Sequence, residues 1–145
     1  MVSRDASGNR STLLGGLFVP SGVAATRTDL WVADWASGMV WQVAGDGAPE
    51  PVATGLANPE GLAVDSDGLL LVVESGAGRL TRIDLSTGVT STVAEGLVMD
   101  APAPGGIPPT FVMSSVTVDS QGTILVSGAG PEQNVIYRIR AVPAA

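Results

Sequence analysis

The amino-acid sequence predicts an all-β fold that is built from three similar units of short strands. A segment with the same order of turn residues and apolar residues begins at Pro20, at Pro59 and at Met113. Pro20 and Pro59 lie about 40 residues apart, which is close to the length of a four-stranded unit in a repeat protein. Gly and Pro, with 19 and 10 copies, are spread along the chain, as expected for short strands joined by turns.

Each unit is expected to begin with an inner strand that ends in a tight turn. The sequences DSDG at 65–68 and DSQG at 119–122 have the composition of such a turn. In turns of this kind Asp and Ser side chains bond their own backbone, and Gly adopts a positive φ. The inner strands are expected at 23–25, 62–64 and 116–118.

Three further strands are expected to complete each unit. The second strand is apolar and ends at Asp34, Glu74 or Gly128, and we expect the two carboxylates to accept backbone N–H groups in the following turns. A β-sandwich without an internal repeat is the alternative, although chance rarely makes turn residues and apolar positions recur together. The second strands are expected at 30–33, 69–73 and 123–126, the third strands at 39–43, 79–83 and 135–139, and the fourth strands at 50–54 and 90–94.

The second unit carries a recognisable motif, PEGLAVDSDG at 59–68 followed by LLVVE at 70–74. It resembles the blades of NHL-repeat proteins and of the gluconolactonase and regucalcin-like family. The segment PSGVAATRTDLWVAD at 20–34 is similar, with a looser turn. The resemblance covers nearly the whole chain from Ser11 and implies a six-bladed β-propeller. It is specific for the fold and not for one activity, because such propellers host many functions.

The predicted strands begin with a fourth strand and end with a third strand. Residues 10–17, RSTLLGGL, are similar to TSTVAEGL at 90–97. A fourth strand is therefore expected at 10–15, ahead of the first complete unit. The whole chain is expected to form a single half-propeller domain, 1–145, with blades at 20–56, 59–97 and 113–140 and a proline-rich insertion at 97–112.

Three blades are too few to close a ring, because known propellers have roughly four to eight. The open edges of such an object would invite strand pairing. We therefore expect a two-fold homodimer in which residues 11–14 of one copy pair beside residues 135–139 of the other. This exchange of strands would close a six-bladed ring. The alternative is that the chain is a piece of a longer propeller.

In propellers the segments before the inner strands and after the second strands share one face around the channel mouth. The insertion at 97–112 is expected on the same face, and its four prolines make it a semi-rigid flap. A loop inserted on one face of a repeat array is often the binding feature. The candidate ligand-binding residues on this face are Glu60, Asn58, Ser21, Ser114, Trp35, Glu74 and Asp100.

Glu60 is the strongest candidate among these residues, because it directly precedes an inner strand. In a two-fold ring two copies of Glu60 would face each other, and like charges in a confined site recruit a cation or raise one pKa. In gluconolactonase-like proteins a Glu at such a position helps to bind a divalent metal together with an Asn and an Asp. The equivalent positions here are Ser21 and Ser114, so calcium would need further oxygen ligands. Glu60 and Asp34 are the candidate catalytic carboxylates.

Composition excludes several classes of site. The net charge is −7 and all seven positive charges are Arg, which argues against binding to nucleic acid or to anionic membranes. Since the sequence has no His and no Cys, it holds no Ser-His-Asp triad, no HExxH motif, no disulfide and no thiolate zinc site. Residues 1–11 have no apolar signal-peptide core, so a cytoplasmic location is expected.

Three functions stay open on the sequence. The first is a module that binds a small ligand or a protein partner in the mouth of the propeller. The second is a metal-dependent lactonase or esterase, in which a divalent ion polarises the ester carbonyl and Glu60 or Asp34 activates water. The third is a structural half-propeller without a ligand.

Overall fold

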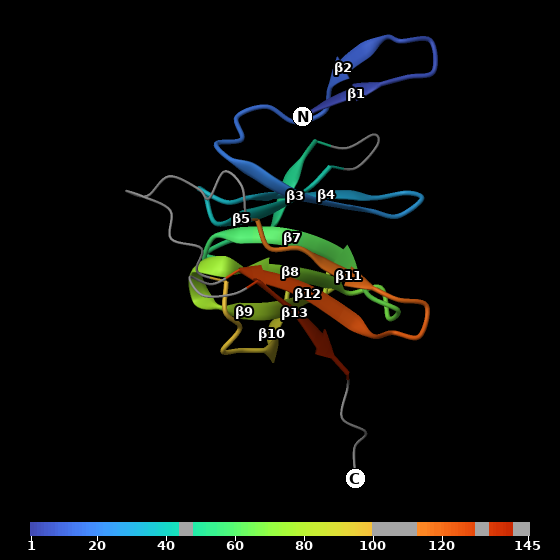
Figure 1. Ribbon diagram of the computed structural model, residues 1–145. Helices are drawn as coiled ribbons and strands as arrows, with labels where there is room; N and C mark the ends of the chain where they lie inside the picture. Colours follow the sequence, from blue (N-terminus) through green and yellow to red (C-terminus); the bar gives the residue numbers. More distant parts are fainter. Residues whose placement is uncertain (44–47, 100–112, 130–133, 141–145) are drawn as a thin grey trace.

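The computed structural model describes residues 1–43, 48–99, 113–129 and 134–140. These ranges contain thirteen strands and one short 3-10 helix, and the strands form four antiparallel sheets (Figure 1). The predicted all-β fold is therefore confirmed. Within the same ranges, no helix is long and apolar enough to cross a membrane. Most of the predicted insertion, including Asp100, lies outside the described residues.

The first sheet is a meander in which each strand pairs with the next strand along the chain. Its second strand is buried on both faces, with Trp31 and Ala33 on one face and Val32 on the other. β-branched and aromatic side chains of this kind fit a pleated surface that is covered on both sides. The strands are β3 (Pro20–Ala25), β4 (Leu30–Asp34), β5 (Met39–Gln42) and β6 (Glu50–Ala53).

The second sheet repeats this meander. It is more buried than the first sheet and than the three-stranded third sheet. All five residues of its second strand, LLVVE at 70–74, are buried. A strand with both faces covered reads as a continuous apolar run instead of an alternating one. The elements are β7 (Pro59–Val64), β8 (Leu70–Glu74), the 3-10 helix η1 (Ser75–Ala77), β9 (Arg79–Ile83) and β10 (Thr90–Ala94).

The third sheet has three strands among the described residues. Its inner turn has the same hydrogen bonds as the inner turn of the second sheet: Asp65 Oδ1 accepts two backbone N–H groups, and Asp119 Oδ1 does the same. Gly68 and Gly122 adopt φ values of 80° and 77°, as the DSDG and DSQG sequences predict. The strands are β11 (Val116–Val118), β12 (Ile124–Ala129) and β13 (Asn134–Ile139).

The N-terminal hairpin corrects one expectation. The sequence predicted a fourth strand at 10–15, whereas the structure has a shorter strand, β2 (Arg10–Thr12), paired with β1 (Val2–Arg4). The sequence analysis did not predict β1. The turn between the two strands is closed by the Asp5 carboxylate, which accepts the N–H groups of Ser7 and Asn9 at 2.9 Å each. The hairpin projects beyond the first sheet (Figure 1).

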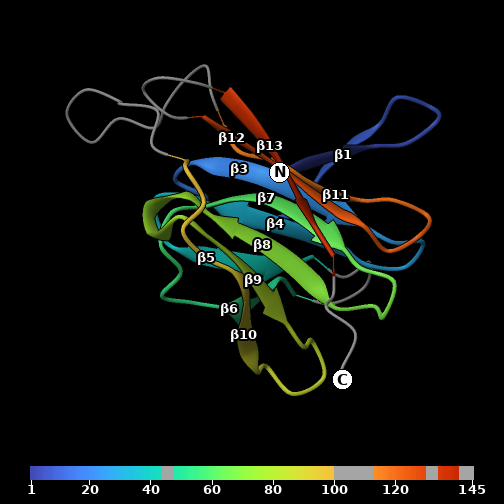
Figure 2. The same cartoon turned by 60° about the horizontal axis from the view of Figure 1, so that its bottom comes forward.

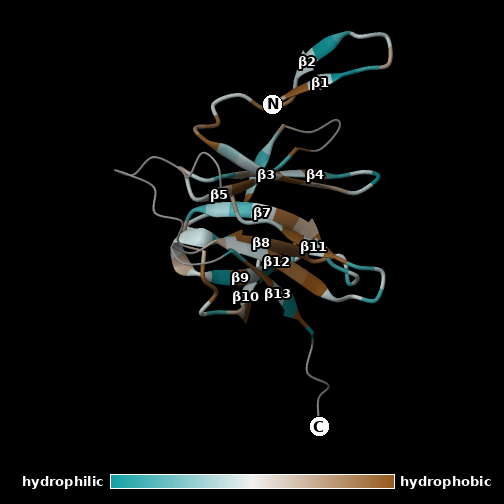
Figure 3. Ribbon diagram, viewed as in Figure 1, coloured by the Kyte–Doolittle hydropathy of each residue, from teal (hydrophilic) through white to brown (hydrophobic). Residues whose placement is uncertain are grey.

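The three sheets stack face to face in chain order, with the inner strands β3, β7 and β11 side by side (Figure 2). Apolar residues follow the strands between the sheets, and polar residues gather at the turns (Figure 3). The first cluster, between the first and second sheets, contains Trp31, Ala33, Val40, Leu62, Leu70, Val72 and Ile83. The second cluster, between the second and third sheets, contains Leu71, Val73, Leu80, Val116, Ile124 and Val126.

A third apolar cluster lies on the other face of the first sheet. Val32 and Val43 form it together with Leu14, and the partly buried Met1, Leu13, Leu17, Leu30 and Trp41 pack around them. The segment at 13–17 therefore covers part of the face that points away from the second sheet. We call this face the free face of the first sheet.

Two glycines allow the inner strands to approach each other closely. A Cβ on Gly22 would lie 1.9 Å from the carbonyl oxygen of Glu60, and a Cβ on Gly61 would lie 2.7 Å from the Cα of Ser115. No side chain fits at such distances, so Gly is required at both junctions. Ser115 occupies the same position in the third sheet and is exposed.

Candidate functional site

Glu60 ties the second sheet to the third. It lies on β7, is only 2% exposed, and its Oε2 accepts a hydrogen bond from the backbone N–H of Ser114, just ahead of β11. The sequence placed Glu60 just before an inner strand at 62–64, whereas β7 begins at Pro59 and includes Glu60, and the sequence did not predict this contact. No residue that the structure describes donates a hydrogen bond to Oε1.

Ser21 has the corresponding role one sheet earlier. Its hydroxyl donates to the carbonyl of Pro59 at 2.7 Å and so joins the first sheet to the second. Ser21 and Glu60 are the second residues of β3 and β7, and Ser114 holds the equivalent position just ahead of β11. Ser21 and Glu60 each contact the sheet that follows in the stack. Ser114 is buried, and the described part of this chain contains no sheet that follows the third.

Asp34 ends β4 and is buried, and its carboxylate is bonded by residues ahead of β3 and by the turn that follows β4. Its Oδ1 accepts the N–H of Val19 at 2.7 Å, and its Oδ2 accepts the N–H of Phe18 at 3.0 Å and the hydroxyl of Ser37 at 2.9 Å. Burial by itself raises the pKa of Asp34, but these hydrogen bonds outweigh burial and hold the pKa below its usual value. Such a carboxylate stays ionised and has its lone pairs occupied, so these contacts do not support a general base.

Glu74 ends β8 in the same way and is fully buried. Arg79 donates two hydrogen bonds to it, at 2.7 and 2.9 Å, and the hydroxyl of Thr81 and the N–H of Ala57 donate one each. Burial by itself raises the pKa of Glu74. The hydrogen bonds from Arg79, Thr81 and Ala57 have the larger opposite effect and hold the pKa below its usual value. Both acids accept hydrogen bonds as predicted, but their backbone donors, Phe18, Val19 and Ala57, lie ahead of β3 and β7 and not in the turns that follow the two acids. A ligand-binding role for Glu74 stays a prediction.

Trp35 and Asn58 contact each other at the junction between the first sheet and the second. The Asn58 side-chain amide donates to the Trp35 carbonyl at 3.4 Å, and Asn58 itself adopts a φ of 52°, which Asn tolerates better than most residues. The carbonyl of Asn58 accepts the N–H and the hydroxyl of Ser75. The Trp35 indole N–H is buried and has no hydrogen-bond partner among the described residues.

The candidates therefore fall into two groups. Asn58 and Trp35 lie at one junction with the Glu74 turn, and Glu60 and Ser114 lie at the next junction. Within the described ranges, no three acidic side chains come close enough together to hold a metal ion. The predicted metal role of Glu60 stays a prediction, and Asp100 lies outside the described residues.

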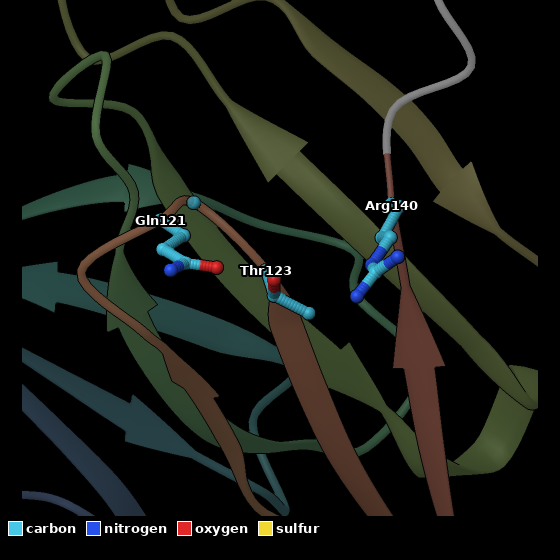
Figure 4. Close-up of a pocket in the computed structure, with 4 residues that line it drawn as sticks. Gln121, Thr123 and Arg140 are labelled. Carbon is cyan, nitrogen blue, oxygen red and sulfur yellow. The ribbon is translucent and has the colours of Figure 1, made fainter.

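The described residues also line three hollows that the sequence did not predict. One of about 380 Å³ is polar, with Gln121 and Thr123 on one side and Arg140 on the other (Figure 4). One of about 310 Å³ lies at the third sheet beside Ser114, Ser127 and Ile136. One of about 190 Å³ lies on the first sheet beside Gly22, Val23 and Val32. The first hollow includes Gln121 and Gly122 of the DSQG motif, which the sequence analysis interpreted only as a turn.

Comparisons with known proteins identify the fold. Residues 56–83, which include β7, β8 and β9, match the family model of the NHL repeat. A solved gluconolactonase from Xanthomonas campestris superposes on 89% of this chain with a TM-score of 0.67 and 21% identity, and this chain covers 46% of it. The fold is that of a β-propeller.

Other solved propellers agree with this identification. A putative gluconolactonase aligns with 93% of the chain at a TM-score of 0.68 and 18% identity, with 50% of its own length covered. The virginiamycin B lyase of Staphylococcus aureus aligns with 87% of the chain at a TM-score of 0.55 and 17% identity, with 42% covered. The chain thus spans about half the length of these propellers. No curated protein matches it.

Proposed function

We propose that the chain is the three-bladed half of a six-bladed propeller, that two copies close the ring, and that a small ligand or a protein partner binds at the channel mouth. The observation that carries this proposal is the exposure of Ile136. Apolar side chains at the same position in the other two sheets are completely covered by the sheet that follows. The third sheet presents this position to solvent.

The strand register establishes the equivalence. Ile136 pairs with Ser127 as Val40 pairs with Ala33 and as Leu80 pairs with Val73. Val40 and Leu80 are 0% exposed, whereas Ile136 is 69% exposed. Leu125 lies on the same face of the third sheet, because side chains alternate along a strand and Ile124 and Val126 pack against the second sheet. This outward face, the free face of the third sheet, contains the hollow of about 310 Å³.

The first sheet offers the complementary surface. Val23 holds the position of Leu62, since Val23 pairs with Val32 as Leu62 pairs with Val72. Leu62 is 7% exposed against the preceding sheet, and Val23 is 56% exposed. A two-fold axis would place the free face of the third sheet of one copy on the free face of the first sheet of the other, and both junctions would form at once.

The mouth of this ring is the proposed binding site. Glu60 Oε1 has no donor among the described residues, and the Trp35 indole N–H has no acceptor among them. The ring would contain two copies of Glu60, and a polar ligand with hydrogen-bond donors would suit the two carboxylates. The net charge of −7 disfavours nucleic acid as the partner.

The solution mass tests the assembly. Light scattering on a sizing column is expected to give about twice the 14.6 kDa of the chain. A folded protein that keeps the mass of one chain up to millimolar concentration would overturn the ring and the mouth with it. If the mass is that of a dimer, a thermal-shift screen of small polar compounds against the wild type and Glu60→Gln would identify ligands whose binding depends on Glu60.

A metal-dependent lactonase is the second candidate, because two of the similar propellers are a gluconolactonase and a putative gluconolactonase. Such an enzyme would need a divalent ion at Glu60 with ligands from water, the backbone or the second copy. Calcium or manganese is then expected to raise the melting temperature, and hydrolysis of gluconolactone is expected to require the metal. No thermal shift at millimolar metal, together with no hydrolysis, would exclude this function.

A further inference from the structure

The segment at 10–17 already lies where the fourth strand of a preceding blade belongs. Val93 and Ala94, at the end of β10, pack into the cluster that joins their own sheet to the next. Leu13 and Leu14 hold the equivalent positions in the similar sequence at 10–17, and they pack on the free face of the first sheet. The segment is therefore seated as a fourth strand whose own inner, second and third strands are missing from the described chain.

The edge of β2 that a third strand would use is occupied by β1. In the second sheet the N–H of Asp84 donates to the carbonyl of Val89, so by the antiparallel alternation the pair Ser91 and Arg82 is hydrogen-bonded. In the hairpin the N–H of Asp5 donates to the carbonyl of Asn9, and by the same alternation Ser11 and Ser3 form a hydrogen-bonded pair.

Ser11 is the equivalent of Ser91, so both serines direct their backbone groups to the strand that lies antiparallel beside them. That strand is β9 for Ser91 and β1 for Ser11. A third strand from another copy, β13, would use the same edge, with Arg138 opposite Ser11 as Arg82 is opposite Ser91. β1 and β13 of a second copy thus exclude each other.

β1 is a weak occupant of this edge. It has three residues, and the side chain of Val2 is exposed. It belongs to a two-stranded hairpin, a unit that is only marginally stable by itself in water. β13 has six residues and already belongs to a sheet that packs on the second sheet. Replacement of β1 by β13 would extend the pairing and continue the third sheet into a complete blade.

We infer that β1 is a detachable placeholder, which covers the strand-pairing edge of β2 in the single chain and is displaced by β13 of a second copy when the ring closes. This inference rests on the proposed two-fold ring. The inference adds a control step to the assembly of the ring, because the free energy of the β1–β2 pairing opposes assembly. A chain that holds β1 more tightly forms fewer rings, and a chain that holds it more loosely forms more.

A reversible lock on β1 tests the inference. Val2 and Thr12 lie opposite each other as a non-hydrogen-bonded pair. The Cα atoms of such pairs are about 4.5 Å apart, a distance that a disulfide can bridge. Both residues are exposed, and the wild-type chain has no Cys, so Val2→Cys with Thr12→Cys supplies the only thiols. The oxidised variant, shown on a non-reducing gel to contain no intermolecular disulfide, is expected to be monomeric at a concentration at which its reduced form is dimeric.

A proline pair provides the opposite perturbation. Ser3→Pro removes an N–H that bonds to β2, whereas Val2→Pro, at a position whose N–H points away from β2, leaves the ladder intact. Ser3→Pro is expected to lower the dimer dissociation constant at least several-fold relative to Val2→Pro. Sedimentation velocity over a concentration series measures both constants.

The outcomes separate the inference from the ring itself. If the oxidised and reduced forms dimerise equally and Ser3→Pro has no effect, the ring stands and the placeholder is wrong. If the wild type and the reduced variant are monomeric at the concentration tested, below millimolar, but Ser3→Pro is dimeric at it, the placeholder is supported, because β1 then raises the dissociation constant of the wild type above that concentration. If every form is monomeric at every concentration, the ring is wrong and the placeholder falls with it.

Discussion

Replacement of Ile136 by Ser probes the junction between the two copies directly. Ile136 is on β13, on the free face of the third sheet, and 69% of its surface is exposed in the single chain. The substitution therefore removes little packing within one chain. In the ring the same side chain would be covered as completely as Val40 and Leu80 are. The variant should fold normally and dimerise poorly.

The size of the effect follows from the area that the junction would cover. Full burial of an Ile side chain stabilises by about 1.5–3 kcal/mol, so covering the part of Ile136 that is still exposed contributes about 1–2 kcal/mol at each junction. A two-fold ring contains the junction twice, which gives about 2–4 kcal/mol per dimer. Since each 1.4 kcal/mol is a factor of ten, the dissociation constant is expected to rise about 30- to 700-fold.

Sedimentation velocity or light scattering over a concentration series measures this constant. Val89→Ser is the matched control, because Val89 is comparably exposed but precedes β10, away from both free faces. Its dissociation constant is expected to equal that of the wild type. Equal constants for Ile136→Ser and Val89→Ser would refute the reasoning. Circular dichroism and urea titration of both variants should show that the single chain is unchanged.

Three further substitutions test contacts inside the chain. Gly22→Ala places a Cβ against the carbonyl of the adjacent inner strand, so urea titration is expected to show a loss of about 1–3 kcal/mol, whereas Gly15→Ala, with open space around it, should lose nothing. Glu74→Gln removes the charge that Arg79 bonds and is expected to cost about 1.5–3 kcal/mol in the same titration; unchanged stability would contradict the buried network. Asp34 has a lowered pKa, so its stabilisation is complete above the unfolded pKa of about 3.9 and is lost as the pH falls through the lower folded value; Asp34→Asn should flatten this acid limb in pH-dependent melts, and an unaltered limb would show that Asp34 does not contribute.

The strand positions could be predicted from the sequence because their signals are local. An Asp that bonds its own turn and a Gly with positive φ need no information from the rest of the chain, and the turns at Asp65 and Asp119 formed as expected. The continuous apolar run of β8 is typical of a strand that is covered on both faces, and all five of its residues are buried. That Asp34 and Glu74 accept hydrogen bonds was also predictable, but the donors were not: the backbone N–H groups come from Val19 and Ala57, ahead of the inner strands, and not from the turns that follow the two acids.

The contacts between sheets could not be predicted in this way. The hydrogen bond from Ser114 to Glu60 joins residues from different sheets, and only the packed inner strands bring them together. β1 was missed because VSR at 2–4 is short and polar and carries no apolar alternation. Its partner β2 was recognisable only through the similarity of 10–17 to 90–97, which gives a strand but not the strand beside it.

The meander order of the strands has a consequence for the kinetics of folding. Every strand pairing among the described residues joins strands that are neighbours in the sequence, and hairpins of this kind form in about 1–10 μs. The β1–β2 hairpin belongs to this fast class, whereas β13 of a second copy must arrive by diffusion. The chain therefore reaches its hairpin-closed form by a first-order reaction before any ring can form. Assembly of the proposed ring would then be second-order, with a rate that falls on dilution and includes the time needed for β1 to detach.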